Sequence, residues 1–387
     1  MRALIRALAM TLAVSLPALA GEPPVTGLQR DVVFTDFPAY ARNGELLRRL
    51  VSPLNAQRLL QRLTPTAVRA QPLDPARQSF VLYVPSGPPP TSGYALLVFV
   101  PPWDDAHVPT QWIPVLDRWH TIFVSAAQSG NDADVLNRRE PLALLAAHGV
   151  MRRYHVDPAH VYIGGFSGGS RIAMRLALGY PDVFKGAVLD AGSDSIGTAE
   201  LPLPPVGLLH QFQQSSRIVF LTGSDDHGPN GGVSAILRPD TQESPIPKDL
   251  YEKERQGFGL MTIKGENGTN QFQNPTLSSQ HSLREWCMEN FDVDTLRGVG
   301  HVLADPSALD FALRHLDAPA QPDADKLSAC RTKVDDQLNT RLQQVQALLD
   351  DRKRDKAQAL LEKIDAQYGG LAAPRSIALM KTLEAAH

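Results

Sequence analysis

The sequence predicts an α/β protein in which helices cover both faces of a mostly parallel, mixed β-sheet. Three observations lead to this expectation. Short apolar runs recur along residues 79–320, helical stretches separate several of them, and a glycine-rich turn joins one run directly to a helix. Buried apolar strands that alternate with helices are typical of a parallel sheet covered on both faces.

Residues 1–20 have the pattern of a secretory signal peptide. Arg2 and Arg6 precede an apolar stretch that is too short to span a bilayer, and an A-L-A tripeptide ends at Ala20. We therefore expect cleavage near Ala20 and export to the periplasm or the medium. An uncleaved amphipathic helix is the alternative.

Residues 21–78 are expected to form an N-terminal helical segment, because leucines recur there at spacings near three and four. Pro53 should divide the pattern into two helices, with Ser52 as the N-cap of the second. The leucines are Leu46, Leu47, Leu50, Leu54, Leu59 and Leu60.

Residues 79–320 are expected to form the α/β domain. Residues 79–84 and 95–100 are apolar runs joined by a turn rich in proline and glycine, so we expect an antiparallel pair. Further strands and two helices follow along the chain. The strands are expected at 121–126, 161–164, 187–189, 217–221 and 293–296, and the helices at 139–154 and 170–179.

Two later stretches differ from this pattern. Residues 226–280 are rich in glycine, proline, asparagine and serine, and we expect a lid or another excursion on the substrate side. Residues 321–387 carry leucines at helical spacing and predict a C-terminal helical hairpin, after which a third short helix could start near Ser376. We expect this hairpin to pack on the α/β domain, with contact to a protein partner as the alternative.

Composition excludes several classes of protein. The chain has 38 Lys and Arg against 41 Asp and Glu, a net charge of −3, and therefore lacks the basic surface typical of nucleic-acid binding. Its 2 cysteines are too few for a disulfide scaffold or a Cys-based zinc site. The long apolar run is confined to the N-terminus, so no transmembrane segment is expected. No spacing of His, Cys or carboxylates suggests a metal site, and we expect no metal and no cofactor.

The strongest chemical signal is the sequence Gly165-Phe-Ser167-Gly168-Gly169, between the predicted strand at 161–164 and the helix at 170–179. This G-x-S-x-G pattern between a strand and a helix is the nucleophile elbow, in which a sharp turn exposes the serine hydroxyl. Ser167 is then the candidate nucleophile, and the backbone N–H of Gly168 is a candidate oxyanion donor. An incidental serine in a glycine-rich turn is the alternative.

A serine nucleophile needs a base, and in this strand order the acid and then the histidine follow the serine. His301 lies in a glycine-rich turn after the predicted strand at 293–296, and is the preferred base. His281 is the second candidate for the base. For the acid, Asp226 is preferred because it follows the buried strand at 217–221, with Asp225 next. Asp194 is a distant third.

A second oxyanion donor is expected from the loop after the strand at 95–100, which reads P-P-W-D-D. Because proline has no N–H, Trp103 is the first residue there that can donate through its backbone. Its indole could instead form a wall of the acyl pocket or simply belong to the core. Cys287 and Cys330 are expected to form a disulfide, because their number is even and an exported protein meets oxidising conditions. Two buried free thiols are the alternative.

Four segments together resemble secreted α/β-hydrolase esterases, most closely the polyhydroxybutyrate depolymerase and feruloyl esterase group. They are residues 129–144, the V-D-P-A-H-V-Y strand at 156–162, the elbow with its following residues at 165–171, and the Y-P-D-V-F turn within 180–186. The resemblance covers roughly residues 79–316. It implies an α/β-hydrolase fold, no cofactor, and a catalytic triad of Ser167, a strand-end aspartate and His301.

These observations predict an exported serine esterase that cleaves small or polymeric esters through an acyl-enzyme. A peptidase on the same fold is the enzymatic alternative. An exported interaction protein that uses an inactive domain of this fold is the non-enzymatic one.

Overall fold

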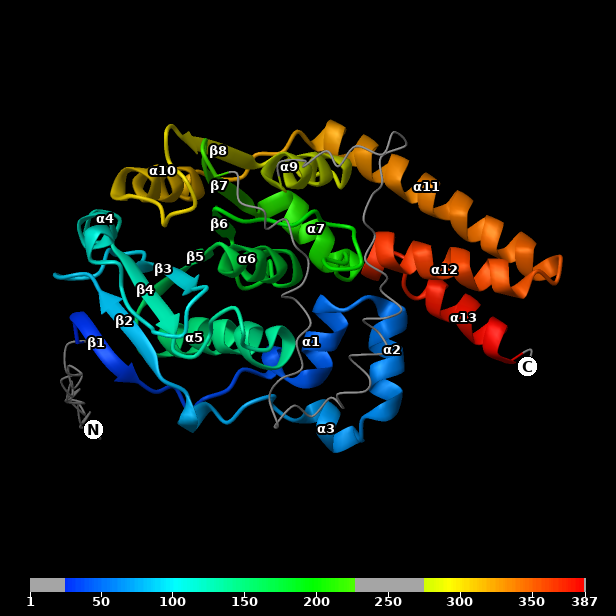
Figure 1. Ribbon diagram of the computed structural model, residues 1–387, viewed down its shortest axis with the longest axis horizontal. Coiled ribbons are helices and arrows are strands. Elements are labelled where there is room, and N and C mark those ends of the chain that lie inside the picture. Colours follow the sequence, from blue (N-terminus) through cyan, green and yellow to red (C-terminus); the bar gives the residue numbers. More distant parts are fainter. Residues whose placement is uncertain (1–24, 227–274, 386–387) are drawn as a thin grey trace, which may run out of the picture.

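The computed structural model describes residues 25–226 and 275–385 of the chain. A single sheet runs through the main domain, and three helices at the C-terminal end extend away from it (Figure 1). The strands are β1 (Gly27–Val32), β2 (Phe80–Val84), β3 (Tyr94–Val100), β4 (Thr121–Ala126), β5 (Val156–Phe166), β6 (Gly186–Asp190), β7 (Arg217–Gly223) and β8 (Phe291–Leu296). The helices are α1 (Asn43–Leu50), α2 (Pro53–Arg62), α3 (Pro65–Arg69), α4 (Ile113–Arg118), α5 (Glu140–Arg153), α6 (Gly168–Gly179), α7 (Val206–Ser215), α9 (Pro275–Glu285), α10 (Pro306–Asp317), α11 (Ala324–Asp350), α12 (Arg354–Tyr368) and α13 (Arg375–Ala385).

The sheet has eight strands in the order β1-β2-β4-β3-β5-β6-β7-β8. The strands from β4 to β8 in this order are parallel to their neighbours, whereas β2 is antiparallel to both β1 and β4. A mostly parallel mixed sheet with helices on both faces, and a serine at a strand–helix turn, is the α/β-hydrolase fold expected from the resemblance.

Two details of the sheet differ from the sequence-based expectation. First, β2 and β3 are not paired with each other, because β4 lies between them. The turn after β2 therefore does not form a hairpin. Second, residues 21–78 contain a strand, β1, as well as helices. Its residues are mostly exposed at the sheet edge, so it lacks the apolar pattern by which a buried strand is recognised.

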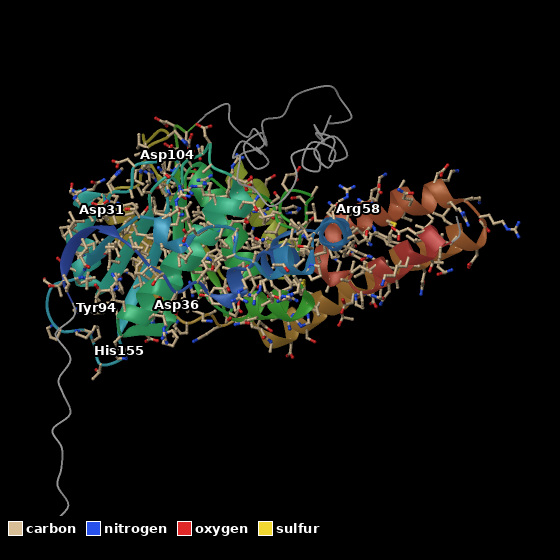
Figure 2. All side chains as sticks on the ribbon, turned by 90° about the horizontal axis from the view of Figure 1, so that it is seen from below. Asp31, Asp36, Arg58, Tyr94, Asp104 and His155 are labelled. Carbon is tan, nitrogen blue, oxygen red and sulfur yellow. A yellow bond between two sulfur atoms is a disulfide. The ribbon has the colours of Figure 1, made fainter. Side chains whose placement is uncertain are left out.

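Alternate side chains of the strands point to opposite faces of the sheet and pack in two separate hydrophobic cores. On one face Leu96 and Val98 of β3 pack with α5 and α6, and on the other Leu97 and Phe99 pack with α4 and α10. Figure 1 shows these helix pairs on opposite sides of the sheet. Asp104 follows the carboxyl end of β3 and Tyr94 begins this strand, and Figure 2 shows them at opposite ends of the domain. The carboxyl edge of the sheet is where the candidate site lies.

The C-terminal helices α11, α12 and α13 pack on one another along an apolar stripe that includes Leu338, Leu361 and Met380. They contact the main domain through α2 and α7. Arg58 of α2 pairs with Glu362 of α12 at 3.1 Å, and Figure 2 shows Arg58 beside these helices. Arg331 of α11 donates to Gln213 Oε1 of α7 at 2.6 Å. This agrees with packing on the α/β domain: α11 and α12 form the expected hairpin, and α13 is the third short helix near Ser376.

Cys287, just after α9, and Cys330 in α11 form a disulfide with their Cα atoms 5.8 Å apart. It is the pairing favoured from the sequence, and it joins the first turns of α11 to the main domain. In the part of the chain that is described, no helix is both long and apolar enough to cross a membrane. The expected signal peptide at 1–20, and nearly all of the expected lid at 226–280, lie outside the described residues.

Candidate active site

The turn between β5 and α6 presents Ser167 in a strained conformation. Its backbone angles, φ of 55° and ψ of −120°, are rarely adopted by residues other than glycine. A Cβ on Gly169 would lie 1.9 Å from the carbonyl oxygen of Val100, and one on Gly165 would lie 2.3 Å from the carbonyl carbon of Gly169. Glycine is therefore required where the strand and the helix approach each other, and this close approach is the elbow that the sequence predicts.

Three side chains meet at the carboxyl edge of the sheet in one hydrogen-bonded chain. His301 Nε2 lies 2.9 Å from Ser167 Oγ, and His301 Nδ1 lies 2.9 Å from Asp226 Oδ2. The imidazole is 46% exposed and the carboxylate 13% exposed, so the base faces solvent while the acid is sheltered. The sequence-predicted nucleophile, base and preferred acid are thus brought together. This is the geometry in which a histidine can take a proton from a serine hydroxyl.

The loops that carry Asp226 and His301 are joined to each other. Ser224 Oγ accepts a hydrogen bond from the Gly298 backbone N–H at 2.8 Å, and the Asp225 N–H donates to the Val299 carbonyl at 3.0 Å. These bonds fix the loop after β7 against the loop after β8. The distance between acid and base is therefore set by backbone contacts between neighbouring strands.

The other candidates from the sequence lie elsewhere. Asp225 is exposed and accepts a hydrogen bond from Ser224 Oγ at 2.9 Å. Asp194 is half-buried and faces Arg171, whose Nε lies 3.5 Å from Asp194 Oδ1. His281 pairs with Glu285 along the exposed face of α9. None of the three belongs to the chain formed by Ser167, His301 and Asp226.

Asp190 is a site residue that the sequence analysis missed. Its backbone carbonyl accepts from the Ser167 N–H at 2.8 Å, and its Oδ2 accepts from the Ala304 N–H at 2.8 Å. One residue thereby holds both the elbow and the loop that carries His301. Burial raises the pKa of the Asp190 carboxyl to about 7, despite the hydrogen bond from Ala304, which lowers it. An aspartate at the end of an apolar strand, within G-A-V-L-D-A-G, was the available signal.

A row of rings lies along one side of the site. Phe166 is 5.1 Å from His301 between ring centroids, Trp103 is 6.0 Å from Phe166, and His107 stacks on Trp103 at 5.1 Å. The Trp103 indole is thus part of a wall near the nucleophile, which was the alternative to its role as a backbone donor. Gly168 is the first residue of α6, where backbone N–H groups have no partner within the helix.

The loop after β4 is bonded to the P-P-W-D-D loop after β3. Asn131 N–H donates to the Pro102 carbonyl at 3.0 Å, and Gly130 N–H donates to Asp104 Oδ1 at 2.9 Å. Below them, the buried Arg139 donates to the Ser129 carbonyl and to the Pro101 carbonyl, each at 2.9 Å. Asp104 therefore helps to hold the loop after β4 against the loop after β3.

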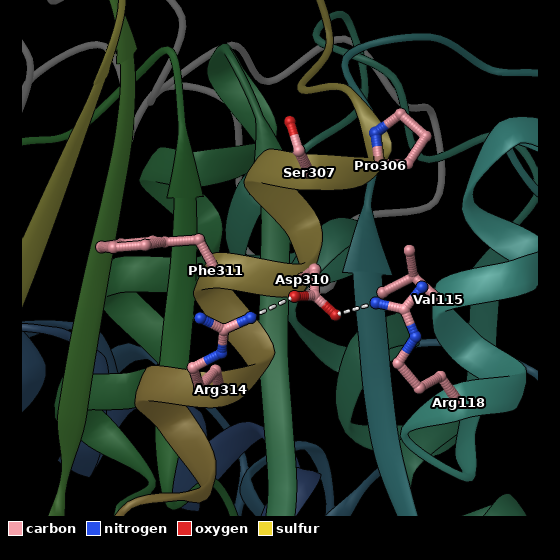
Figure 3. Close-up of a pocket in the computed structure, with 7 residues that line it drawn as sticks. All are labelled: Val115, Arg118, Pro306, Ser307, Asp310, Phe311 and Arg314. Atoms are coloured by element: carbon pink, nitrogen blue, oxygen red, sulfur yellow. Dashed lines mark hydrogen bonds and ion pairs between the residues drawn. The ribbon is translucent and has the colours of Figure 1, made fainter.

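Among the described residues, no group of three or more His, Cys, Asp or Glu side chains is arranged to hold a metal ion. A surface pocket of about 430 Å³ lies between α4 and α10 (Figure 3). Asp310 pairs there with Arg118 at 2.7 Å and with Arg314 at 2.6 Å. The pocket is not lined by Ser167 or His301, and its charged groups are occupied by one another.

No protein-family model and no curated protein sequence matches this chain. Among solved structures, a poly(3-hydroxybutyrate) depolymerase from Bordetella parapertussis is 19% identical over 67% of this chain and 92% of its own, with a TM-score of 0.39. A ferulic acid esterase is 13% identical over 62% of this chain and 91% of its own, with a TM-score of 0.39. These are the two kinds of enzyme in the group that the sequence resembles.

The chain also aligns with a longer protein from Bacteroides ovatus, provisionally described as a dipeptidyl aminopeptidase IV. The identity is 12%, the alignment covers 62% of this chain and only 33% of the other, and the TM-score is 0.39. Likenesses this distant carry no information about the reaction, whereas the strand order and the elbow are features of this chain's own structure.

Proposed function

We propose that this protein is a serine hydrolase that cleaves carboxylic esters through an acyl-enzyme. The observation that carries the proposal is the hydrogen-bonded chain in which His301 contacts Ser167 Oγ with one ring nitrogen and Asp226 Oδ2 with the other, both at 2.9 Å. A nucleophile, a base and a group that orients the base are the minimum set for this chemistry.

In the first half of the reaction, Ser167 Oγ attacks the carbonyl carbon of the ester, and His301 Nε2 takes the hydroxyl proton. The negative charge that develops on the carbonyl oxygen is stabilised by the Gly168 N–H at the start of α6. The tetrahedral intermediate then collapses, the bond to the alcohol oxygen breaks, and His301 gives its proton to the leaving alcohol. The acyl group remains on Ser167.

In the second half, water takes the place of the alcohol. His301 accepts a proton from the water as its oxygen attacks the acyl carbon, and returns the proton to Ser167 Oγ as the acid departs. Asp226 stays ionised, keeps Nδ1 protonated and stabilises the imidazolium that forms in each half.

Two further proposals accompany this reaction. The row formed by His107, Trp103 and Phe166 offers an apolar surface for part of the substrate, which is either a small ester or a chain of a polymer. Export is supported by the N-terminal sequence pattern and by the disulfide, because a disulfide persists in oxidising compartments.

A panel of p-nitrophenyl esters of increasing acyl length, compared with the matching p-nitroanilides, tests the proposed activity. We expect turnover of the esters, with one acyl length preferred, and little or no turnover of the anilides. Faster cleavage of the anilides would identify a peptidase instead. No turnover of either series, together with no labelling by a fluorophosphonate probe, would favour a non-catalytic interaction protein.

A further inference from the structure

The loop that carries His301 is attached to the rest of the domain on both sides of the histidine. On the N-terminal side, the backbone of residues 298–299 bonds to the loop after β7, which also carries Asp226. These bonds set the distance from His301 to Asp226. They do not reach the elbow, so the distance from His301 to Ser167 must be set elsewhere.

Ala304 is the attachment on the C-terminal side of His301. Its N–H donates to Asp190 Oδ2 at 2.8 Å, and its carbonyl accepts from Trp112 Nε1 at 2.8 Å. Asp190 ends β6, and Trp112 lies in the single helical turn Thr110–Trp112 before α4. All three residues are at most 2% exposed, so water does not compete for either bond. Side chains from two separate elements thus hold one peptide of the base loop.

Asp190 also connects this attachment to the nucleophile. Its backbone carbonyl accepts from the Ser167 N–H at 2.8 Å, while its side chain holds Ala304. Ser170 Oγ of α6 donates to the same carbonyl at 2.7 Å, which fixes the end of β6 against the elbow helix. One buried residue therefore joins the backbone of the nucleophile to the loop of the base.

The Asp190 carboxyl is costly to keep at this place. Burial disfavours the ionised carboxylate, and this raises its pKa to about 7. An apolar side chain would avoid the cost, but the Ala304 N–H would then lose its acceptor. Departures of this kind from an apolar core are typical of functional sites.

We propose that Asp190 and Trp112 are positioning residues that set the distance of 2.9 Å between Ser167 Oγ and His301 Nε2. Both act through Ala304 and the backbone of the His301 loop, and not on the substrate. The inference rests on the proposed ester hydrolysis. It adds that the two sides of the base loop have different tasks: residues 298–299 align the base with the acid, and Ala304 aligns it with the nucleophile.

Three variants test this role. Asp190→Ala removes the acceptor for the Ala304 N–H, Trp112→Phe removes the indole donor but keeps a ring, and Asp190→Asn keeps an oxygen that can accept. The carbonyl bond from residue 190 to Ser167 is present in all three. Misplacing a catalytic group by about 1 Å can cost about 10² in rate, so we expect a loss of kcat of that order for Asp190→Ala and a smaller one for Trp112→Phe. KM should change little, and Asp190→Asn should recover most of the lost kcat.

Asp365→Ala is the matched control for the loss of a buried carboxyl. Asp365 is also buried and also accepts from a backbone N–H, that of Leu54, but it lies in α12. This variant should be less stable than the wild type and keep its kcat at temperatures at which it is folded. A fall in kcat that comes only from lost stability would appear in both Asp190→Ala and Asp365→Ala.

A double variant separates positioning of the base from a general distortion of the site. With His301→Ala the base is already lost, so the addition of Asp190→Ala should lower the residual rate of ester hydrolysis by less than about threefold. A large further fall would show that the Asp190 side chain supports the elbow instead, and would overturn the inference. If Asp190→Ala does not fold, the same comparison with Trp112→Phe decides.

The remaining outcomes distinguish this inference from the proposed function. A wild-type enzyme that hydrolyses esters, with every folded variant among Asp190→Ala and Trp112→Phe within about threefold of its kcat, would overturn the inference and leave the proposed function standing. A wild-type protein that neither hydrolyses esters nor reacts with a fluorophosphonate at Ser167 would overturn both.

Discussion

The carboxyl edge of the sheet and the C-terminal helices hold their parts together in opposite ways. At the edge, Ser167, His301 and Asp226 come from three separate loops, and their positions are set by short polar contacts. The helices α11, α12 and α13 pack along an apolar stripe that continues into the core of the main domain, for example where Trp286 contacts Tyr368, and a disulfide and polar contacts add to this attachment. In the first region, partly exposed side chains are held at defined distances by hydrogen bonds. In the second, buried apolar side chains hold the helices together.

This difference separates chemistry from stability. Substitutions at the carboxyl edge should change turnover with little effect on unfolding, because the side chains there are partly exposed and contribute little apolar burial. Substitutions in the C-terminal region should change unfolding with little effect on turnover, because none of its side chains lies in the Ser167–His301–Asp226 chain.

The largest expected effect is that of Ser167→Ala. Loss of the nucleophile in a triad costs on the order of 10⁶ in kcat, equivalent to about 8 kcal/mol of activation free energy. The thermal midpoint should stay nearly unchanged or rise slightly, since the hydroxyl is not part of the core. Steady-state kinetics and a melting curve on the same preparation measure both quantities. Residual turnover above a few per cent would remove Ser167 from the nucleophile role.

The next effect compares two adjacent aspartates. Asp226→Asn should lower kcat by about 10⁴, because an asparagine no longer keeps His301 in the tautomer that accepts the serine proton. Asp225→Asn should lower it far less, since the Asp225 carboxylate accepts from Ser224 Oγ, whereas the imidazole bonds to Asp226. The two variants differ by one position in the same turn, so each is the control for the other. The reverse ranking would make Asp225 the triad acid.

In the C-terminal region, the double variant Cys287→Ser with Cys330→Ser should lower the free energy of unfolding without lowering kcat. The disulfide spans 43 residues, and closing a loop of that length is worth about 4 kcal/mol in the chain-entropy model. Chemical denaturation should report a loss of that order, while kcat stays within about twofold at temperatures where the variant is folded. A large drop in kcat of the folded variant would show that the two regions are coupled.

The smallest expected effect is a change in how stability depends on pH. Asp365 of α12 accepts hydrogen bonds from the Leu54 N–H of α2, and burial raises the pKa of its carboxyl to about 6, while the charge of nearby Arg58 lowers it and that of Glu362 raises it. The folded protein therefore binds this proton more tightly than the unfolded chain, whose carboxyl has a pKa near 3.8. Its contribution to the free energy of unfolding is complete below about pH 4 and is lost as the pH rises through about 6, by at most about 3 kcal/mol.

Asp365→Asn keeps an oxygen that can accept from Leu54 but removes the titration. Melting curves between about pH 4 and about pH 7 should therefore show the variant gaining stability relative to the wild type as the pH rises. Parallel curves for the two proteins would contradict this account of Asp365.

The sequence predicts the parts of the fold that have strong local patterns. The residues of β4 and β6 are buried, and their apolar runs predict strands. The exposed edge strand β1 has no such run and is missed. The insertion of β4 between β2 and β3 cannot be predicted from the sequence either. It depends on the side of β3 to which the chain returns after α4, and local sequence patterns carry no information about that side.

The same distinction applies to the site. Ser167 can be predicted because the elbow demands glycines around it, and His301 because the order along the chain leaves few candidates. The sequence could prefer Asp226 over Asp225 only weakly, since the choice depends on the contact of Ser224 with Gly298 in a loop far along the chain. Asp190 acts through contacts with the elbow and with the loop that carries His301, and its place at the end of an apolar strand is the signal that the sequence offers for it.

Labelling with a fluorophosphonate, followed by mass spectrometry of the digested protein, tests the central claim most directly. The probe reacts with a serine only when a neighbouring base activates it. The account predicts one adduct, on the peptide that carries Ser167, at a rate that falls sharply in His301→Ala and to zero in Ser167→Ala. An unlabelled wild-type protein, or an adduct on any other serine, would contradict the claim that Ser167, His301 and Asp226 act together as the catalytic site.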